Sequence, residues 1–219
     1  MAYLLAIDTT AGTSVALLAD GRLLGQVQHE IGLKHAENIG DSIAQVFEQT
    51  GIRPKVLDAV VVGRGPALFT GLRVGIAAGI MFAEAAGAQC LGVVSHDAIA
   101  LELYHSDGNL PESPLLIHTD ARRGEVYWAL YGGLDSAGIP VVLAGPSVGK
   151  YEEVLQALTT EFGELTDRTG GATAEWVARL AELQLAAGRS SEDVTALYLR
   201  APDAALPKPN QQFGKRVSG

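Results

Sequence analysis

The sequence is poor in cysteine, in basic residues and in long apolar runs. Its only cysteine, Cys90, excludes an intramolecular disulfide, which fits a reducing compartment. The longest apolar stretch, residues 74–83, contains two glycines and is too short to span a bilayer. The N-terminus lacks the basic residues that begin a signal peptide, and Asp8 ends its apolar run too early for one. We therefore expect a cytoplasmic protein without a membrane partner.

Basic residues are too few for a protein that binds nucleic acid on its own. The chain has 16 Lys and Arg against 25 Asp and Glu, so its formal net charge is −9. Both halves, residues 1–104 and residues 105–219, are acidic. Because phosphate contacts dominate nucleic-acid affinity, such a protein would normally carry a basic field. If RNA is the final substrate, another protein must hold most of it.

The periodicity of apolar residues predicts an α/β protein. The turn Asp20-Gly21 predicts a hairpin, Thr70 a helix N-cap, and Gly51 and Gly87 helix ends. The expected strands are residues 3–7, 14–18, 23–29, 59–62, 91–94, 115–119, 125–131, 141–144 and 194–200. The expected helices are residues 35–50, 71–86, 151–161 and 173–187, with another starting at residues 98–103.

Two lobes are predicted, with a polar stretch at residues 105–114 between them. Residues 1–104 form the N-terminal lobe, residues 105–200 a smaller C-terminal lobe, and residues 201–219 a flexible tail. Each lobe begins with an apolar strand that ends in an acidic residue. A tight turn and a second, returning strand follow. The acidic residues are Asp8 and Asp120, and this echo suggests a duplicated unit.

Asp8, Thr9 and Thr10 form the first candidate site, at the end of a predicted strand. A carboxylate beside hydroxyl groups and turn amides can position a magnesium-bound phosphate. The simpler interpretation is that these side chains only cap the hairpin, and the sequence alone favours it.

Residues 63–73 form the second candidate site, where glycines precede a helix N-terminus. Arg64 and Arg73 add positive charge, so a phosphate or carboxylate could bind there. The glycine spacing is not that of a P-loop. A plain strand-to-helix turn with surface arginines explains the same residues equally well.

The helix at residues 71–86 has little polar surface. Gly71, Gly75, Ala78 and Gly79 share one side with Phe82, next to an aliphatic side. Because glycine costs about 0.8–1.0 kcal/mol relative to alanine inside a helix, close approach of another element must offset it. We expect the aliphatic side to pack on the home sheet and the glycine side to dock a helix of another chain. The alternative is a helix enclosed within its own lobe.

A metal site is not predicted, because no two of the five histidines have the i, i+4 spacing of a helical metal pair. There is also no Gly-x-Ser-x-Gly elbow of a serine hydrolase.

Four segments of the chain match one known family. They are the Asp8-Thr9-Thr10 hairpin, Gly63-Arg64-Gly65-Pro66 followed by Phe69-Thr70-Gly71, residues 120–127, and Tyr198-Leu199-Arg200. These segments resemble the TsaB (YeaZ) family of tRNA threonylcarbamoyladenosine biosynthesis. It implies two ribonuclease-H-like lobes of the actin/Hsp70/sugar-kinase superfamily, the second one reduced. It also implies a non-catalytic subunit whose two N-lobe helices, residues 35–50 and 71–86, dock a TsaD-type paralogue. Ile39 and Ile43 thereby join the expected docking residues.

The resemblance also implies a division of labour. The TsaD-type partner carries the metal and transfers the threonylcarbamoyl group, a TsaE-type ATPase joins the assembly, and tRNA is contacted only indirectly. TsaD has a His-x-x-x-His metal pair where this chain has His96 and Ala100, so a chelating partner is missing. We expect no cofactor to be held by the chain alone, with ATP or ADP bound at the joint surface. A homodimer is expected when the partner is absent.

An enzyme remains the alternative. In that interpretation the chain is an autonomous ATP-dependent kinase or ATPase of the same superfamily, with Asp8 and Asp120 around magnesium-ATP.

Overall fold

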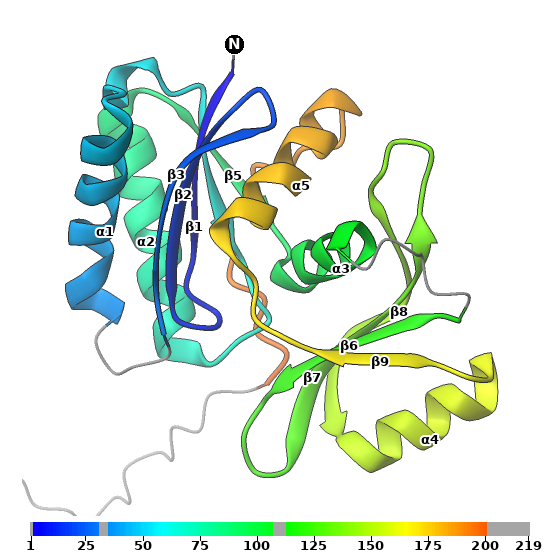
Figure 1. The fold of residues 1–219 in the computed structure, drawn as a ribbon. Helices are drawn as coiled ribbons and strands as arrows, with labels where there is room; N and C mark the ends of the chain where they lie inside the picture. Colours follow the sequence, from blue (N-terminus) through cyan, green and yellow to red (C-terminus); the bar gives the residue numbers. More distant parts are fainter. Residues whose placement is uncertain (1, 31–34, 107–112, 201–219) are drawn as a thin grey trace, which may run out of the picture.

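Two β-sheets organise the computed structural model, which describes residues 2–30, 35–106 and 113–200 (Figure 1). The tail predicted at residues 201–219 lies outside the described residues. Within the described residues no helix is long and apolar enough to cross a membrane.

The first sheet combines a hairpin meander with two parallel strands, as the early apolar runs predict. Its spatial order is β3 (Arg22–His29), β2 (Thr13–Ala19), β1 (Tyr3–Asp8), β4 (Ala59–Gly63) and β5 (Gln89–Val93). The turn between β2 and β3 has positive φ at both Asp20 and Gly21, the conformation that an Asp-Gly hairpin favours. β4 runs parallel to β1, and β5 runs parallel to β4.

The second sheet is smaller and also begins with antiparallel strands. Its spatial order is β8 (Pro140–Lys150), β7 (Glu125–Leu134), β6 (Leu115–Asp120) and β9 (Thr166–Thr169). β9 pairs parallel to β6, and its four polar residues carry no apolar alternation that could have predicted a strand.

The helices form layers on both sides of the first sheet (Figure 1). One outer layer holds α1 (His35–Thr50), the short 3₁₀ helix η1 (Pro54–Val56) and α2 (Phe69–Ala86). α3 (Ser95–Ser106) and α5 (Ala174–Ala186) lie between the two sheets, and α4 (Tyr151–Phe162) covers the other face of the second sheet.

One continuous apolar cluster joins the two sheets through α3 and α5. It contains Leu4 of β1, Leu101 of α3, Ile117 of β6 and Leu180 of α5, all nearly fully buried. The predicted lobe boundary must therefore be corrected for α5. Although α5 falls within residues 105–200, it packs on β1 and β2 of the first sheet.

Two local predictions were wrong. α2 begins at Phe69 after Leu68, so Thr70 lies inside the helix and is not its N-cap. The strand expected at residues 194–200 is not a strand. That segment instead packs the partly buried Val194 and Ala196 against the first sheet and α2, while Tyr198 is 38% exposed.

Candidate functional site

A cleft of about 350 Å³ lies where turns from both sheets meet. The β1–β2 turn contributes Thr9 and Thr10, the β6–β7 region contributes Thr119 and Asp120, and α3 contributes His96. The remaining lining residues are Ala11, Gly12, Pro66, Ala67, Leu68, Gly71, Ile99, Arg122, Thr169, Gly170 and Gly171. Thus the predicted residues Thr9, Thr10 and Asp120, far apart in sequence, do come together.

Asp8 lies just behind this cleft and is 1% exposed. Its Oδ1 accepts hydrogen bonds from the backbone N–H of Thr10 at 2.8 Å and from the Thr10 hydroxyl at 2.5 Å. Its Oδ2 accepts a hydrogen bond from the Ser95 hydroxyl at 2.7 Å. Burial raises the pKa of Asp8, although these hydrogen bonds act in the opposite direction. Asp8 therefore serves as the buried anchor of the turn.

Asp120 is placed very differently, because its side chain is 65% exposed. Its Oδ1 accepts a hydrogen bond from the backbone N–H of Arg122 at 2.7 Å, and its Oδ2 lies 3.4 Å from the Arg122 guanidinium. Both charged groups face solvent at the rim of the cleft. An exposed ion pair of this kind contributes little to stability.

His96 is a residue of the cleft that the candidate site had not included. It is 1% exposed, and its Nε2 lies 2.9 Å from the Thr119 hydroxyl. Its Nδ1 has no hydrogen-bond partner among the described residues. Burial, and then the nearby His118, lower the pKa of His96 to about 3, so its ring is neutral at pH 7. Only the comparison of residues 95–100 with the TsaD metal pair had drawn attention to it.

The described residues of the cleft include few side chains that could bind a metal ion. Within residues 2–30, 35–106 and 113–200, no three His, Cys, Asp or Glu side chains are grouped so that they could hold a metal ion. The position four residues after His96 is the buried Ala100.

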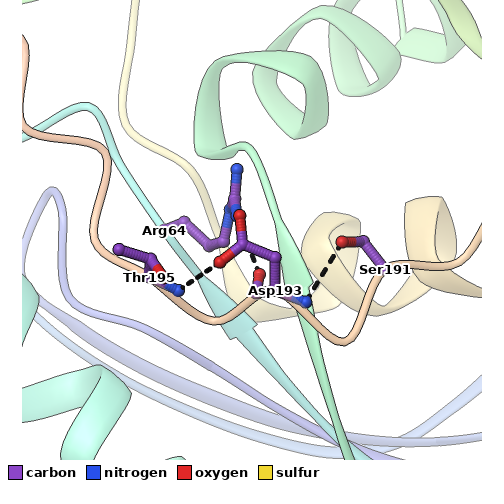
Figure 2. A network of polar contacts seen from close by, with 4 residues as sticks. All are labelled: Arg64, Ser191, Asp193 and Thr195. Carbon is purple, nitrogen blue, oxygen red and sulfur yellow. Dashed lines mark hydrogen bonds and ion pairs between the residues drawn. The ribbon is translucent and has the colours of Figure 1, made fainter.

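Arg64 does not reach the cleft, because the chain's own C-terminal segment engages it. Figure 2 shows its guanidinium beside Asp193, with which it forms an ion pair and a 2.8 Å hydrogen bond to the backbone carbonyl. Asp193 also accepts a hydrogen bond from the backbone N–H of Thr195 at 2.9 Å. Hydrogen bonds from Thr195, followed by that from Arg64, lower the pKa of Asp193 to about 2. The positive charge of Arg64 is thus neutralised away from the cleft.

Arg73 is engaged by the same segment. Its Nε donates a 2.6 Å hydrogen bond to the Tyr198 hydroxyl, and its guanidinium lies 5.4 Å from the centre of the Tyr198 ring. The anion site predicted from Arg64 and Arg73 is therefore corrected. The structure separates these arginines from Asp8, Thr9 and Thr10, because residues 193–198 bind them instead.

The glycine side of α2 faces its own sheet, which corrects the predicted docking side. A Cβ atom at Gly75 would lie 2.3 Å from the Thr9 hydroxyl, and one at Gly79 would lie 2.1 Å from a methyl group of Val62. The close approach that offsets the cost of these glycines is therefore made by the β1–β2 turn and β4. A helical repeat identifies residues that share a side, but not which neighbour that side meets.

The other predicted docking residues also lie inside the lobe. Ile39 and Ile43 are each 7% exposed and pack in the core beneath α1. Ala78 is half-buried against the same core, and the Phe82 ring stacks on Phe47 of α1 with centroids 5.6 Å apart. Gly71 lines the cleft, where its carbonyl accepts a 2.9 Å hydrogen bond from the Thr9 hydroxyl.

The side of α2 that points away from the sheet carries exposed apolar residues beside the exposed charged residues Arg73 and Glu84. Met81 is 73% exposed and Ile80 is 42% exposed, with the exposed Ala77 and Ala85 on either side along the helix. We call Ala77, Ile80, Met81 and Ala85 the outer α2 face. A methionine that is 73% exposed next to an isoleucine that is 42% exposed is typical of a surface that another protein covers.

Residues 25–175 match the family model of TsaD, the tRNA N6-adenosine threonylcarbamoyltransferase. The chain belongs to this family. Within the family, its resemblance to the TsaB (YeaZ) proteins is confirmed. It is 35% identical to TsaB, the tRNA threonylcarbamoyladenosine biosynthesis protein of Escherichia coli, over 131 residues that cover 58% of this chain and 54% of that protein.

Other relatives cover more of the chain. An uncharacterised protein of Mycobacterium leprae is 34% identical over 220 residues, which cover 93% of this chain and 56% of the relative. This TsaD-family chain therefore spans about half the length of these two curated relatives. The solved structure of YeaZ from Pseudomonas aeruginosa superposes with a TM-score of 0.73 at 26% identity, covering 91% of this chain and 100% of that one.

Proposed function

We propose that the chain is a non-catalytic subunit that binds and activates a TsaD-type transferase in the threonylcarbamoylation of a tRNA adenosine next to the anticodon. The named relatives act in threonylcarbamoyladenosine biosynthesis, which supports the pathway. Each sheet begins with the same strand–turn–strand unit, which supports two ribonuclease-H-like lobes of the actin/Hsp70/sugar-kinase superfamily, the second one reduced.

The outer α2 face is the observation that carries this proposal. α1 and α2 lie side by side, joined by the stacked rings of Phe47 and Phe82, so they present one two-helix surface (Figure 1). On α1, a Cβ added at Gly40 would meet no atom within 4 Å, so a partner can approach the helix backbone there. Two partner helices would cover Ile80 and Met81, and removing this exposed apolar surface from water favours binding.

The proposed assembly has three further features. A TsaE-type ATPase joins the heterodimer, ATP or ADP binds at the joint surface, and tRNA is held mainly by the partner because this chain is acidic. When the partner is absent, a second copy covers the outer α2 face.

A single substitution tests the docking surface. Met81→Glu places a charge at the centre of the outer α2 face, and we expect it to weaken binding to a purified TsaD homologue by at least about tenfold. Calorimetry measures the affinity. Gln156→Glu, on the exposed side of α4, is the matched control and should bind like the parent chain. Equal affinities for both variants would contradict the proposed surface.

An autonomous ATPase or kinase is the second candidate, favoured by the convergence of Thr9, Thr10 and Asp120 on one cleft. Calorimetry with magnesium-ATP on the isolated chain, with Asp120→Ala as control, decides between the two. Binding in the micromolar range that is lost in the variant, together with turnover, would favour the enzyme.

A further inference from the structure

A pocket of about 520 Å³ lies at the end of α3 and α5 that is remote from the cleft. α3 contributes His96 to the cleft, whereas it contributes Leu101 and His105 to this pocket. α5 contributes residues between Trp176 and Ala186. Both helices lie between the two sheets, so α2 is on the other side of the first sheet (Figure 1). We call this cavity the α3–α5 pocket, and it shares no residue with the cleft or with the outer α2 face.

The walls of the α3–α5 pocket are apolar and aromatic. Leu4 of β1 and Leu101 of α3 are 1% and 0% exposed, and the partly buried Leu183 and Trp176 of α5 pack against the same core. The ring of His105 lies 5.4 Å from that of Trp176, tilted by 46°. Pockets of about 300–1,000 Å³ with such walls and a few polar groups are typical of small-molecule sites. Two rings in this arrangement can also contact the edge or face of an aromatic ligand.

Hydrogen bonds between distant segments hold the rim of the pocket in place. Asp20 Oδ1 accepts a 2.7 Å hydrogen bond from the N–H of Ala2, and Glu182 Oε1 accepts one of 2.8 Å from the N–H of Gly21. The carbonyl of Gly21 accepts a 2.9 Å hydrogen bond from Arg179. The β2–β3 turn is therefore fixed to α5. Because the pocket is preformed, a ligand loses little of its binding energy to ordering the protein.

Negative charge prevails beside the pocket. Arg179 lines it, but its Nε and Nη2 donate hydrogen bonds of 3.0 and 2.8 Å to Glu175 Oε1, which balances the guanidinium charge. Glu182 also lines it and, among the described residues, bonds only to the backbone of the β2–β3 turn. Burial, and then the nearby Glu175, raise the pKa of Glu102 on α3, although a hydrogen bond with Trp176 lowers it. The net charge of −9 acts in the same direction.

The polar atoms left for a ligand are acceptors. Oε2 of Glu182 is not used by the turn, which bonds to Oε1. His105 Nδ1 lies 2.9 Å from the carbonyl of Leu101, and a carbonyl only accepts hydrogen bonds, so Nδ1 carries the proton. In the neutral ring Nε2 is then an acceptor as well. A ligand that suits the pocket therefore combines an apolar body with a positively charged donor.

We infer that the α3–α5 pocket binds an arylalkyl amine, a small molecule whose ring lies against Trp176 and Leu183 and whose ammonium group is bound by Glu182. An ammonium group has three N–H donors and no acceptor, which matches the acceptors at the rim. A carboxylate on the same body would meet Glu182 with like charge, and a hydroxyl group would lack the ionic attraction. The pocket thus selects its ligand by charge as well as by apolar contact.

Three ligands with the same body test this selection, and Trp176 reports on them. The chain has two tryptophans, so Trp128→Phe leaves Trp176 as the sole fluorescent indole. We expect phenylbutylamine to change its emission with a dissociation constant of about 1 mM or lower, and phenylbutyrate to bind at least about tenfold more weakly. Phenylbutanol should lie between them. No saturable change with the amine, or equal affinities for the three ligands, would overturn the inference. Ligand-observed NMR on the parent chain repeats the series without the Trp128 substitution.

Removing the charge of Glu182 locates the ammonium group. Glu182→Gln keeps an oxygen that can accept from the N–H of Gly21, so the turn is preserved. We expect the amine to bind at least about fivefold more weakly and phenylbutanol to bind as before. Glu153→Gln on α4, where the side chain is 71% exposed, is the matched control and should change neither affinity. Equal effects of the two substitutions on the amine would show that Glu182 does not bind it.

Filling the pocket locates the apolar body. Ala186 lines the pocket at the exposed end of α5, so Ala186→Phe can enter it without disturbing the core. We expect this variant to weaken both the amine and phenylbutanol by at least about tenfold. Ala157→Phe makes the same change on the exposed side of α4 and should bind both ligands like the parent chain. If both variants bind the amine like the parent chain, the ligand lies elsewhere and the inference is wrong.

Discussion

In the β1–β2 unit the acidic residue Asp8 is 1% exposed, whereas in the matching β6–β7 unit the side chain of Asp120 is 65% exposed. What lies behind each carboxylate accounts for the difference. Gly63 and the Ser95 hydroxyl enclose Asp8, and a Cβ atom at Gly63 would lie 1.8 Å from its Oδ2. Asp120 instead bonds to its own turn and faces solvent. A repeated pattern in sequence therefore does not imply a repeated role.

The largest expected effect comes from filling the space behind Asp8. Gly63→Ala should lower the free energy of unfolding by about 3–5 kcal/mol, because the added methyl group collides with a buried carboxylate and with Ser95. Gly124→Ala, in the β6–β7 turn, has open space around it and a φ of 72°, so it should cost only about 1–2 kcal/mol. Urea denaturation measures both. Similar costs would remove the contrast between the two units.

Removing the carboxylates should give the next largest difference. Asp8→Ala leaves the Thr10 N–H and the Ser95 hydroxyl without their acceptor in a buried site, at a cost of about 2–3 kcal/mol. Asp120→Ala should cost less than about 1 kcal/mol, because water replaces the exposed contacts. The comparison fails if the two melting temperatures fall equally.

The smallest effect concerns pH. Because burial raises the pKa of Asp8 in the folded chain, the protonated form is favoured there, and the associated stability is lost as the pH rises through the folded-state pKa. The melting temperature of the parent chain should therefore fall relative to that of Asp8→Asn as the pH is raised from about 4 to about 7. A rise relative to Asp8→Asn would mean that the hydrogen bonds from Thr10 and Ser95 outweigh burial.

Much of the fold could be predicted because local signals agree with tertiary packing. The helix predicted at residues 35–50 has those bounds in the structure, since its apolar repeat meets a sheet and Gly51 ends it with a φ of 67°. The Asp20-Gly21 turn likewise determines its own geometry. β9 could not be predicted, because polar residues become a strand there only through pairing with β6.

The candidate site was predictable only in part. Turn chemistry indicated Thr9, Thr10 and Asp120, and the strand order brings them together. The outer α2 face was missed because a helical repeat does not say which side meets the sheet, and the glycines suggested the wrong one. Arg64 and Arg73 were misplaced because their partners, Asp193 and Tyr198, lie about 125 residues further along the chain.

The packing of α5 on the first sheet also bears on how the chain is synthesised. Ser14 Oγ accepts a 2.9 Å hydrogen bond from the N–H of Ala174, across 160 positions of sequence. On a ribosome adding about 5–20 residues per second, β1 and β2 wait on the order of ten seconds or more for the helix that covers them. Leu4 and Leu18 belong to the cluster that α5 completes, so they lack its cover for that interval. We therefore expect nascent chains that stop before α5 to need a chaperone.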